Sequence, residues 1–307
     1  MGNLKQLQIL ENVDIKRISR KAIKELGELT QLRKLAVTGV GASKKKCKAF
    51  CEAAEKLSSL RSLNVSSREL NKEAELDMFV SWTSPLPSLL SLKLKGRLQE
   101  IPSWVAKSVN LVKIELKYCG LKELEALAEL PNLMQVRIYG DAYNEKLVFH
   151  KHAFSKLRIL HLELHHALRE VTFEESASPN MESITILYCK LTSGINGIKY
   201  LPKLREINVR HCRLAKQDML QEEAGKHPNH PVLQMVNCDP ANTEQSAELP
   251  TRAKQQAQIP LRLGPYLSRS SRCWTTFSPA MPDSGDRAGA RPVGPTPSPH
   301  RNVLRVS

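Results

Sequence analysis

Apolar residues recur in one order along the first 240 residues, Leu-x-x-Leu-x-x-Leu-x-Leu or a close variant of it. Copies include "LTQLRKLAV" from Leu29, "LPSLLSLKL" from Leu86 and "LPNLMQVRI" from Leu130. The second apolar position of nine such copies, from Leu7 to Leu204, returns at steps of 22 to 29 residues. Apolar and polar residues alternate at the end of each copy, which predicts a short strand with one buried face.

This consensus with this period is typical of a leucine-rich repeat. A single repeat cannot bury its apolar strand face, whereas stacked repeats share a continuous core and align their strands in parallel. We therefore expect an α/β fold over residues 1–240, a leucine-rich-repeat solenoid (horseshoe) of nine to ten repeats with a parallel concave sheet. The convex side is expected to be helical or irregular. Residues 43–57 have helical spacing with Ser43 as a cap, and "ELEALAEL" predicts a short helix.

The composition changes after Pro240. Residues 241–307 contain 9 of the 18 prolines and carry +5 of the formal net charge of +15. This basic Pro/Ser/Arg-rich tail has too little apolar surface to fold alone, so we expect it to be disordered. At the other end the chain opens inside a repeat, so we expect either that another domain covers this end or that the chain is a fragment.

Three cysteines, Cys119, Cys189 and Cys212, share the frame Leu/Ile/Val-x-x-Cys-x-Leu after a predicted strand, and His165 occupies the same slot in another repeat. A small side chain in this slot turns inward and packs in the core, so we interpret all four residues as structural. The competing interpretation is a metal site. Successive slots form a line at strand spacing and do not converge as zinc ligands must, and no Cys-x-x-Cys or His-Glu-x-x-His is present.

Other chemical motifs are sparse. "GVGASKKK" lacks the Gly-Lys-Ser/Thr of a phosphate-binding loop, and no Gly-x-Ser-x-Gly is present. We therefore expect no enzyme activity and no cofactor. Seven scattered cysteines, no recognisable signal peptide and no run of 18 apolar residues favour a cytoplasmic chain that does not span a membrane.

The outward positions of the predicted strands form a strip along the concave face. The strip is mixed in charge and basic in its middle, and enlarged sheets of this kind usually bind proteins. A single tyrosine among the basic residues is poor support for nucleic-acid binding, which uses interleaved aromatic residues. The residues predicted to contact a protein partner are Lys93, Lys95, Lys113, Glu115, Lys117, Arg137, Tyr139, His161, Glu163 and Arg210.

Longer phrases point to a family. "LQEIPSWVAKSVNLVKIELKYCGLKELEALAELPNLMQVRI" resembles the repeats of plant coiled-coil, nucleotide-binding, leucine-rich-repeat disease resistance proteins, and "GIKYLPKLREINVRHC" is similar to them as well. The resemblance covers residues 1–240. It implies that Leu98, Ile101, Pro102 and Trp104 form a structural turn. Because the nucleotide-binding motifs of that family do not occur in this sequence, the resemblance implies nothing about ATP or ADP.

The resemblance also implies partners. In that family the repeats sense a pathogen effector or a guarded host protein, and they pack on the nucleotide-binding domain to hold it inactive. We therefore expect a non-catalytic protein-recognition module of a plant intracellular immune receptor. The alternative is a stand-alone adaptor or scaffold, such as a substrate-recognition subunit for ubiquitin ligation, although no F-box is present. An extracellular receptor domain is disfavoured, because the sequence lacks paired capping cysteines and a steady 24-residue period.

Overall fold

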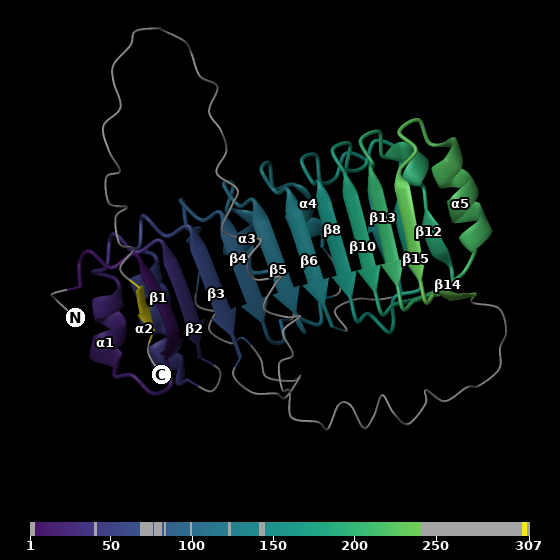
Figure 1. The fold of residues 1–307 in the computed structure, drawn as a ribbon. Helices are drawn as coiled ribbons and strands as arrows, with labels where there is room; N and C mark the ends of the chain where they lie inside the picture. The colour runs from purple at the N-terminus through teal and green to yellow at the C-terminus, as the bar shows by residue number, and fades with distance from the viewer. Residues whose placement is uncertain are drawn as a thin grey trace, which may run out of the picture. The chain divides into compact units, whose positions relative to one another are not determined.

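One parallel sheet organises the molecule (Figure 1). The computed structural model describes residues 4–240, with gaps at 40–41, 68–75, 77–81, 83, 99, 122–123 and 141–144, together with residues 303–305. All of these residues belong to one unit, residues 1–242 with 300–307. Within the described residues the sheet has eleven strands in the order β15-β13-β10-β8-β6-β5-β4-β3-β2-β1-β17.

The strands fall where the repeat pattern predicts them. They are β1 (Ile9–Asp14), β2 (Lys34–Thr38), β3 (Ser62–Ser66), β4 (Ser91–Lys95), β5 (Lys113–Lys117), β6 (Gln135–Tyr139), β8 (Ile159–Glu163), β10 (Ser183–Leu187), β13 (Glu206–Arg210), β15 (Val232–Val236) and β17 (Val303–Arg305). From β2 to β15, neighbours pair residue by residue in parallel, for example Leu92 with Ile114. The predicted leucine-rich-repeat solenoid is confirmed.

The core is built from the inward residues of these strands and the leucines that precede them. Leu63, Ile114 and Ile184, each the second residue of its strand, are completely buried. The preceding leucines Leu60 and Leu111 are buried to the same degree. Each repeat thus buries its apolar face against the next, as a solenoid requires.

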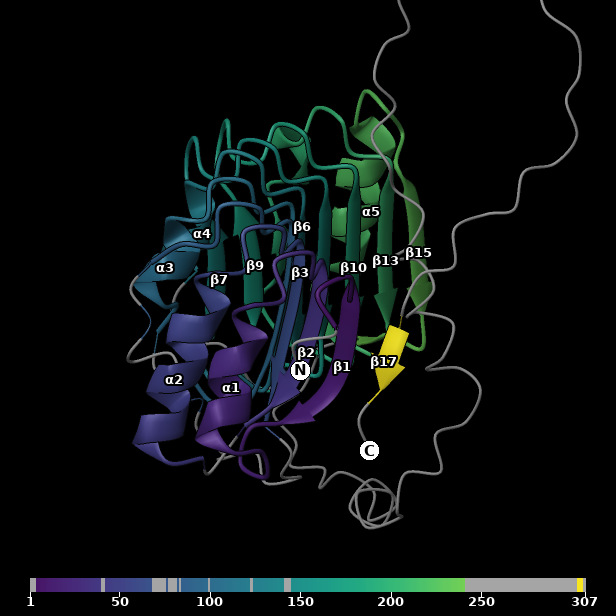
Figure 2. The ribbon, with the colours of Figure 1, turned by 90° about the vertical axis from the view of Figure 1, so that its left-hand side faces the viewer.

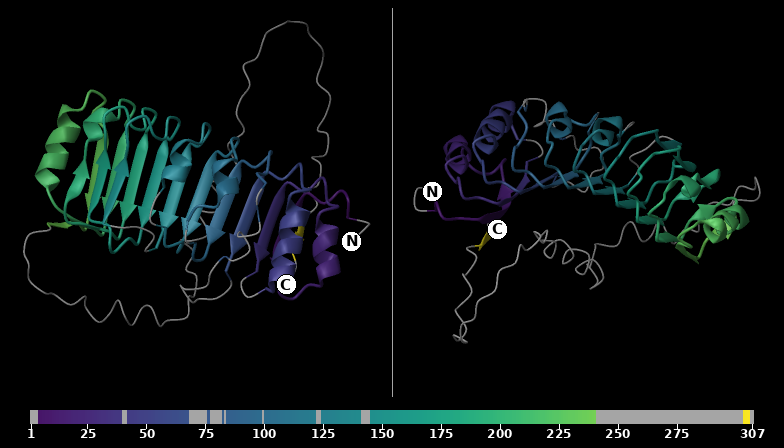
Figure 3. Two further views of the ribbon diagram at one scale, coloured as in Figure 1. Left: turned by 180° about the vertical axis from the view of Figure 1, so that it is seen from behind. Right: turned by 90° about the horizontal axis from the view of Figure 1, so that it is seen from above.

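Helices lie on one face of the sheet, and the right-hand view of Figure 3 shows the sheet curving with the helices on its outer side (Figures 2 and 3). The helices are α1 (Arg20–Leu26), α2 (Lys44–Ala54), α3 (Ser103–Ala106), α4 (Glu125–Ala128), the 3-10 helix η2 (Ile198–Tyr200) and α5 (Gln217–Lys226). We call the opposite face the concave face. Ser43 occupies the N-cap of α2, but its side chain makes no capping hydrogen bond. By contrast, Ser19 Oγ accepts from Ala22 N at 3.1 Å at the start of α1.

Two smaller parallel sheets of the described residues, absent from the sequence prediction, lie outside the main sheet. One has the order β12-β9-β7, from β7 (Lys146–Phe149), β9 (Glu170–Phe173) and β12 (Gly194–Asn196). The other has the order β11-β14-β16, from β11 (Lys190–Leu191), β14 (Arg213–Leu214) and β16 (Asp239–Pro240). The segments "KLVF" and "EVTF" alternate more exposed and buried residues and end in buried phenylalanines, and their valines and aromatic residues favour strand over helix.

Asparagines before the strands connect successive repeats. Asn110 Nδ2 donates to the carbonyl of Pro87 at 2.8 Å, and Asn132 Nδ2 donates to that of Val109 at 3.0 Å. Asn180 Nδ2 does the same with Ser155 O at 2.7 Å. These bonds satisfy turn carbonyls that no strand partner reaches.

A left-handed residue follows several strands and sets the direction of the next side chain. Tyr118, Leu164, Tyr188 and His211 have φ between 53° and 63°, which is uncommon for bulky residues. Each immediately precedes one of the four slot residues, Cys119, His165, Cys189 and Cys212, which are at most 2% exposed. The slot side chains bond backbone carbonyls: His165 Nε2 lies 3.1 Å from Ile138 O, and Cys212 Sγ donates to Ile186 O at 3.6 Å.

Residues 303–305, which the sequence places in the tail, form β17 and pair in parallel with β1, Ile9 opposite Val303 (Figure 2). The rest of the predicted disordered tail, residues 241–302 and 306–307, lies outside the described residues.

Candidate partner-binding surface

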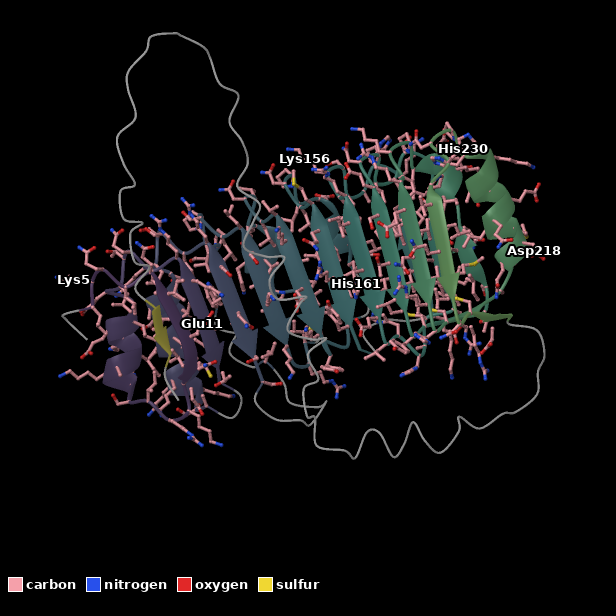
Figure 4. All side chains as sticks on the ribbon, in the orientation of Figure 1. Lys5, Glu11, Lys156, His161, Asp218 and His230 are labelled. Atoms are coloured by element: carbon pink, nitrogen blue, oxygen red, sulfur yellow. The ribbon has the colours of Figure 1, made fainter. Side chains whose placement is uncertain are left out.

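The middle of the concave face carries a connected set of polar side chains from β4, β5, β6 and β8. Figure 4 shows this face toward the viewer, with His161 labelled on it. Strand pairing places Glu115 opposite both Lys93 and Arg137, and places Tyr139 opposite both Lys117 and Glu163. We call this set the central network: Lys93, Glu115, Lys117, Gln135, Arg137, Tyr139, His161 and Glu163.

Glu115 is the centre of the network. Its residue is only 5% exposed although it occupies an outward strand position. Lys93 Nζ lies 3.1 Å from one carboxylate oxygen, and Lys117 Nζ lies 3.0 Å from the other. Burial alone would raise the pKa of Glu115, but the ammonium groups of Lys117 and Lys93 outweigh it and lower this pKa below its ordinary value. Glu115 therefore stays ionised and holds two lysines.

Tyr139 links this ion pair to the next strands. Lys117 Nζ lies 4.3 Å from the centroid of the Tyr139 ring, a cation–π distance. The Tyr139 and His161 rings are 5.2 Å apart, and His161 Nε2 lies 3.1 Å from Glu163 Oε2. Burial, with the nearby Glu115 charge, raises the pKa of Tyr139 despite a hydrogen bond from Arg137, so the phenol stays neutral.

The guanidinium of Arg137 is held by Gln135, a residue of the same strand β6. With its amide oxygen turned toward Arg137, Gln135 accepts from Nε and Nη2 at 2.6 and 2.9 Å. Gln135 is only 7% exposed. Gln135 is not among the predicted contact residues, because a neutral amide in an outward position carries no charge signal. Its place two residues before Arg137, on the same face of one strand, could have identified it.

The structure brings together most of the predicted contact residues. Lys93, Glu115, Lys117, Arg137, Tyr139, His161 and Glu163 join in the network, and Lys95 and Lys113 lie on β4 and β5 beside it. Arg210 is the exception. It lies on β13, where it donates to Asn208 Oδ1 at 2.8 Å and to Gln234 Oε1 at 3.3 Å, and β10 separates it from β8.

The slot cysteines have the surroundings of core residues. Burial raises the pKa of the Cys119 thiol to about 12, and a hydrogen bond with Cys212, together with burial, raises the pKa of Cys189. The thiols of Cys119 and Cys189 therefore form little reactive thiolate. Across the described ranges, no three His, Cys, Asp or Glu side chains are grouped so that they could hold a metal ion.

A protein-family model matches most of the chain. The family model described as "Leucine-rich repeat region" matches residues 1–233. The chain belongs to that family. The solved internalin InlF of Listeria monocytogenes matches 70% of this chain and 63% of its own, at 15% identity and a TM-score of 0.42.

Curated relatives are plant disease resistance proteins, as the sequence resemblance indicated. This leucine-rich-repeat chain is 26% identical to disease resistance protein RPM1 of Arabidopsis thaliana over 209 residues. The matched segment covers 67% of this chain and 22% of that relative. Disease resistance protein RPP8 of the same plant is 28% identical over 60% of this chain and 20% of its own length. Disease resistance protein PIK6-NP of Oryza sativa subsp. japonica is 25% identical over 68% of this chain and 22% of its own length. The chain thus spans about a fifth of the length of these relatives.

A search of the described helices finds none that combines the length and apolar character needed to cross a bilayer.

Proposed function

We propose that this chain is the non-catalytic protein-recognition module of a plant intracellular immune receptor. Its partner is a pathogen effector, a guarded host protein or the nucleotide-binding domain of a full-length receptor, met in the cytoplasm. The central network carries this proposal, because it places charged and aromatic side chains in fixed positions on an open sheet face. The plant disease resistance relatives support the immune context.

The network suits protein recognition for a physical reason. Lys93 and Lys117 keep 30% and 37% of their side chains exposed while their ammonium groups are held by Glu115. Groups held in place before binding lose less conformational entropy when a partner docks. Tyr139 adds an amphipathic ring of the kind enriched in interfaces.

A capture experiment tests this function. The full chain is immobilised, and proteins from plant tissue challenged with a pathogen are captured and identified by mass spectrometry. The variant Lys95→Glu reverses one charge beside the network, and Lys45→Glu makes the same change on α2, on the helical face. We expect one protein to be captured by wild type and by Lys45→Glu, and to be captured in a smaller amount by Lys95→Glu. If wild type and both variants captured every protein in equal amounts, the interface would lie elsewhere on the chain.

A further inference from the structure

The basic side chains in the middle of the concave face lie on three strands. The outward residues of β3 on one side are Ser62, Asn64 and Ser66, and those of β10 on the other are Ser183, Thr185 and Leu187. None of these is ionisable. Between them the outward positions of β4, β5, β6 and β8 hold five basic and two acidic side chains. The local formal charge is therefore +3, with the basic side chains confined to β4, β5 and β6.

The two carboxylates already have partners. Each oxygen of Glu115 faces one lysine, and Glu163 pairs with His161. Lys95 has no ion-pair partner within the described part of the chain. It also stands directly opposite Lys117 on the neighbouring strand. Like charges in this relation repel, and Glu115 offsets only the charge of Lys117, so a carboxylate from outside would neutralise the remaining charge of Lys95.

The size of the basic region limits what fits. Strands β4, β5 and β6 are consecutive, and two strand spacings amount to about 10 Å. An extended peptide advances about 3.3 Å per residue, so about three to four residues crossing the strands cover the region. A long polyanion such as nucleic acid gains most from a basic track, and the flanking strands β3 and β10 carry no ionisable outward side chain that would extend one.

Resting on the proposed function, we infer that the partner presents a short acidic segment of three to four residues to β4, β5 and β6. Its carboxylates bind among Lys93, Lys95 and Lys117 and toward Arg137. Glu115 acts as a positioning residue, because it fixes the two lysines whose exposed ends the segment contacts. Tyr139 supports Lys117 from the next strand.

The test uses acetylated, fluorescein-labelled tetraglutamate and the full chain. Fluorescence anisotropy is expected to show saturable binding at low salt that weakens at 0.15 M salt, because exposed charges are screened. Tetraglutamine should not bind. Lys95→Glu should weaken the affinity about tenfold, since one attraction becomes a repulsion. The matched Lys45→Glu on α2 should bind as wild type does.

Several outcomes would overturn the inference. The inferred acidic segment would be ruled out if tetraglutamate failed to bind, or if it bound wild type and Lys95→Glu equally. A single-stranded 20-nucleotide DNA that binds more tightly and is equally sensitive to Lys95→Glu would assign the patch to polyanions. If a captured protein depends on Lys95 but tetraglutamate does not displace it, the proposed function stands and only the acidic segment is wrong.

Discussion

Removing the charge of Glu115 is the sharpest perturbation of the central network. The variant Glu115→Gln keeps the shape of the side chain and abolishes both ion pairs. Lys93 and Lys117 are then left close together without the group that holds them. We expect lower stability and a looser arrangement of the two lysines.

The magnitude follows from exposure. A hydrogen bond to a charged group contributes about 1.5–3 kcal/mol when buried. Here the carboxylate is buried, but both lysines reach solvent and can rehydrate, so the contribution is discounted. We estimate a loss of about 1–2 kcal/mol, equivalent to a melting temperature lower by about 2–8 °C for a domain of this size.

The pH dependence has a definite sign. Because the folded pKa of Glu115 lies below its ordinary value, ionised Glu115 binds its proton less readily when folded than when unfolded. The stability it contributes is therefore fully present above the unfolded pKa and is lost as pH falls through the folded pKa. The stability gap between wild type and Glu115→Gln should be constant near neutral pH and narrow below about 4.5.

Urea unfolding of both proteins, followed by circular dichroism between pH 7 and pH 4, measures this gap. Glu222→Gln is the control, because Glu222 pairs with Lys226 at the surface of α5 and should leave stability at the wild-type value. A Glu115→Gln variant as stable as wild type at pH 7, or a gap that widens on acidification, would refute the reasoning.

Three further substitutions, two at repeat turns and one in α5, extend these tests. Cys189→Ala should cost about 1 kcal/mol or more in urea unfolding through lost packing; stoichiometric zinc in purified wild type that disappears in this variant would contradict the structural interpretation. Gly140→Ala should cost about 1–3 kcal/mol, because Gly140 has φ +78° and an added Cβ would lie 2.3 Å from the Tyr118 ring. Gly225→Ala, within α5 and with nothing within 4 Å, should instead stabilise by about 0.5–1 kcal/mol, and an equal loss at both glycines would refute this account.

The main strands were predictable because each repeat carries its own signal. The alternation in "SLKLK" or "VRIYG" defines a strand and its buried face without reference to the rest of the chain. The second layer was harder. The segments that form β7 and β9 are only four residues long, and their pairing joins residues about 24 positions apart, such as Leu147 with Val171. Short apolar segments of this length do not decide between strand and turn.

The candidate site shows the same limit. The strand pattern assigns Lys93, Lys117 and Arg137 to the outward face of neighbouring strands, and the strand pairing places them there. The alternation within β5 assigns Glu115 to the outward face and does not indicate its burial, which accompanies ion pairs with Lys117 on its own strand and Lys93 on β4. The left-handed turn at Tyr118 was also missed, because left-handed backbone is usually signalled by glycine or asparagine.

The most direct test of partner recognition by the concave face is site-specific photo-crosslinking. A benzophenone amino acid replaces Asn64, which lies opposite Lys93 in the neighbouring strand, or Lys45 on α2 as the matched position on the helical face. In plant cells we expect a covalent adduct with one protein from position 64, reduced by Lys95→Glu, and none from position 45. Adducts from position 45 alone, with none from position 64, would contradict recognition through the concave face.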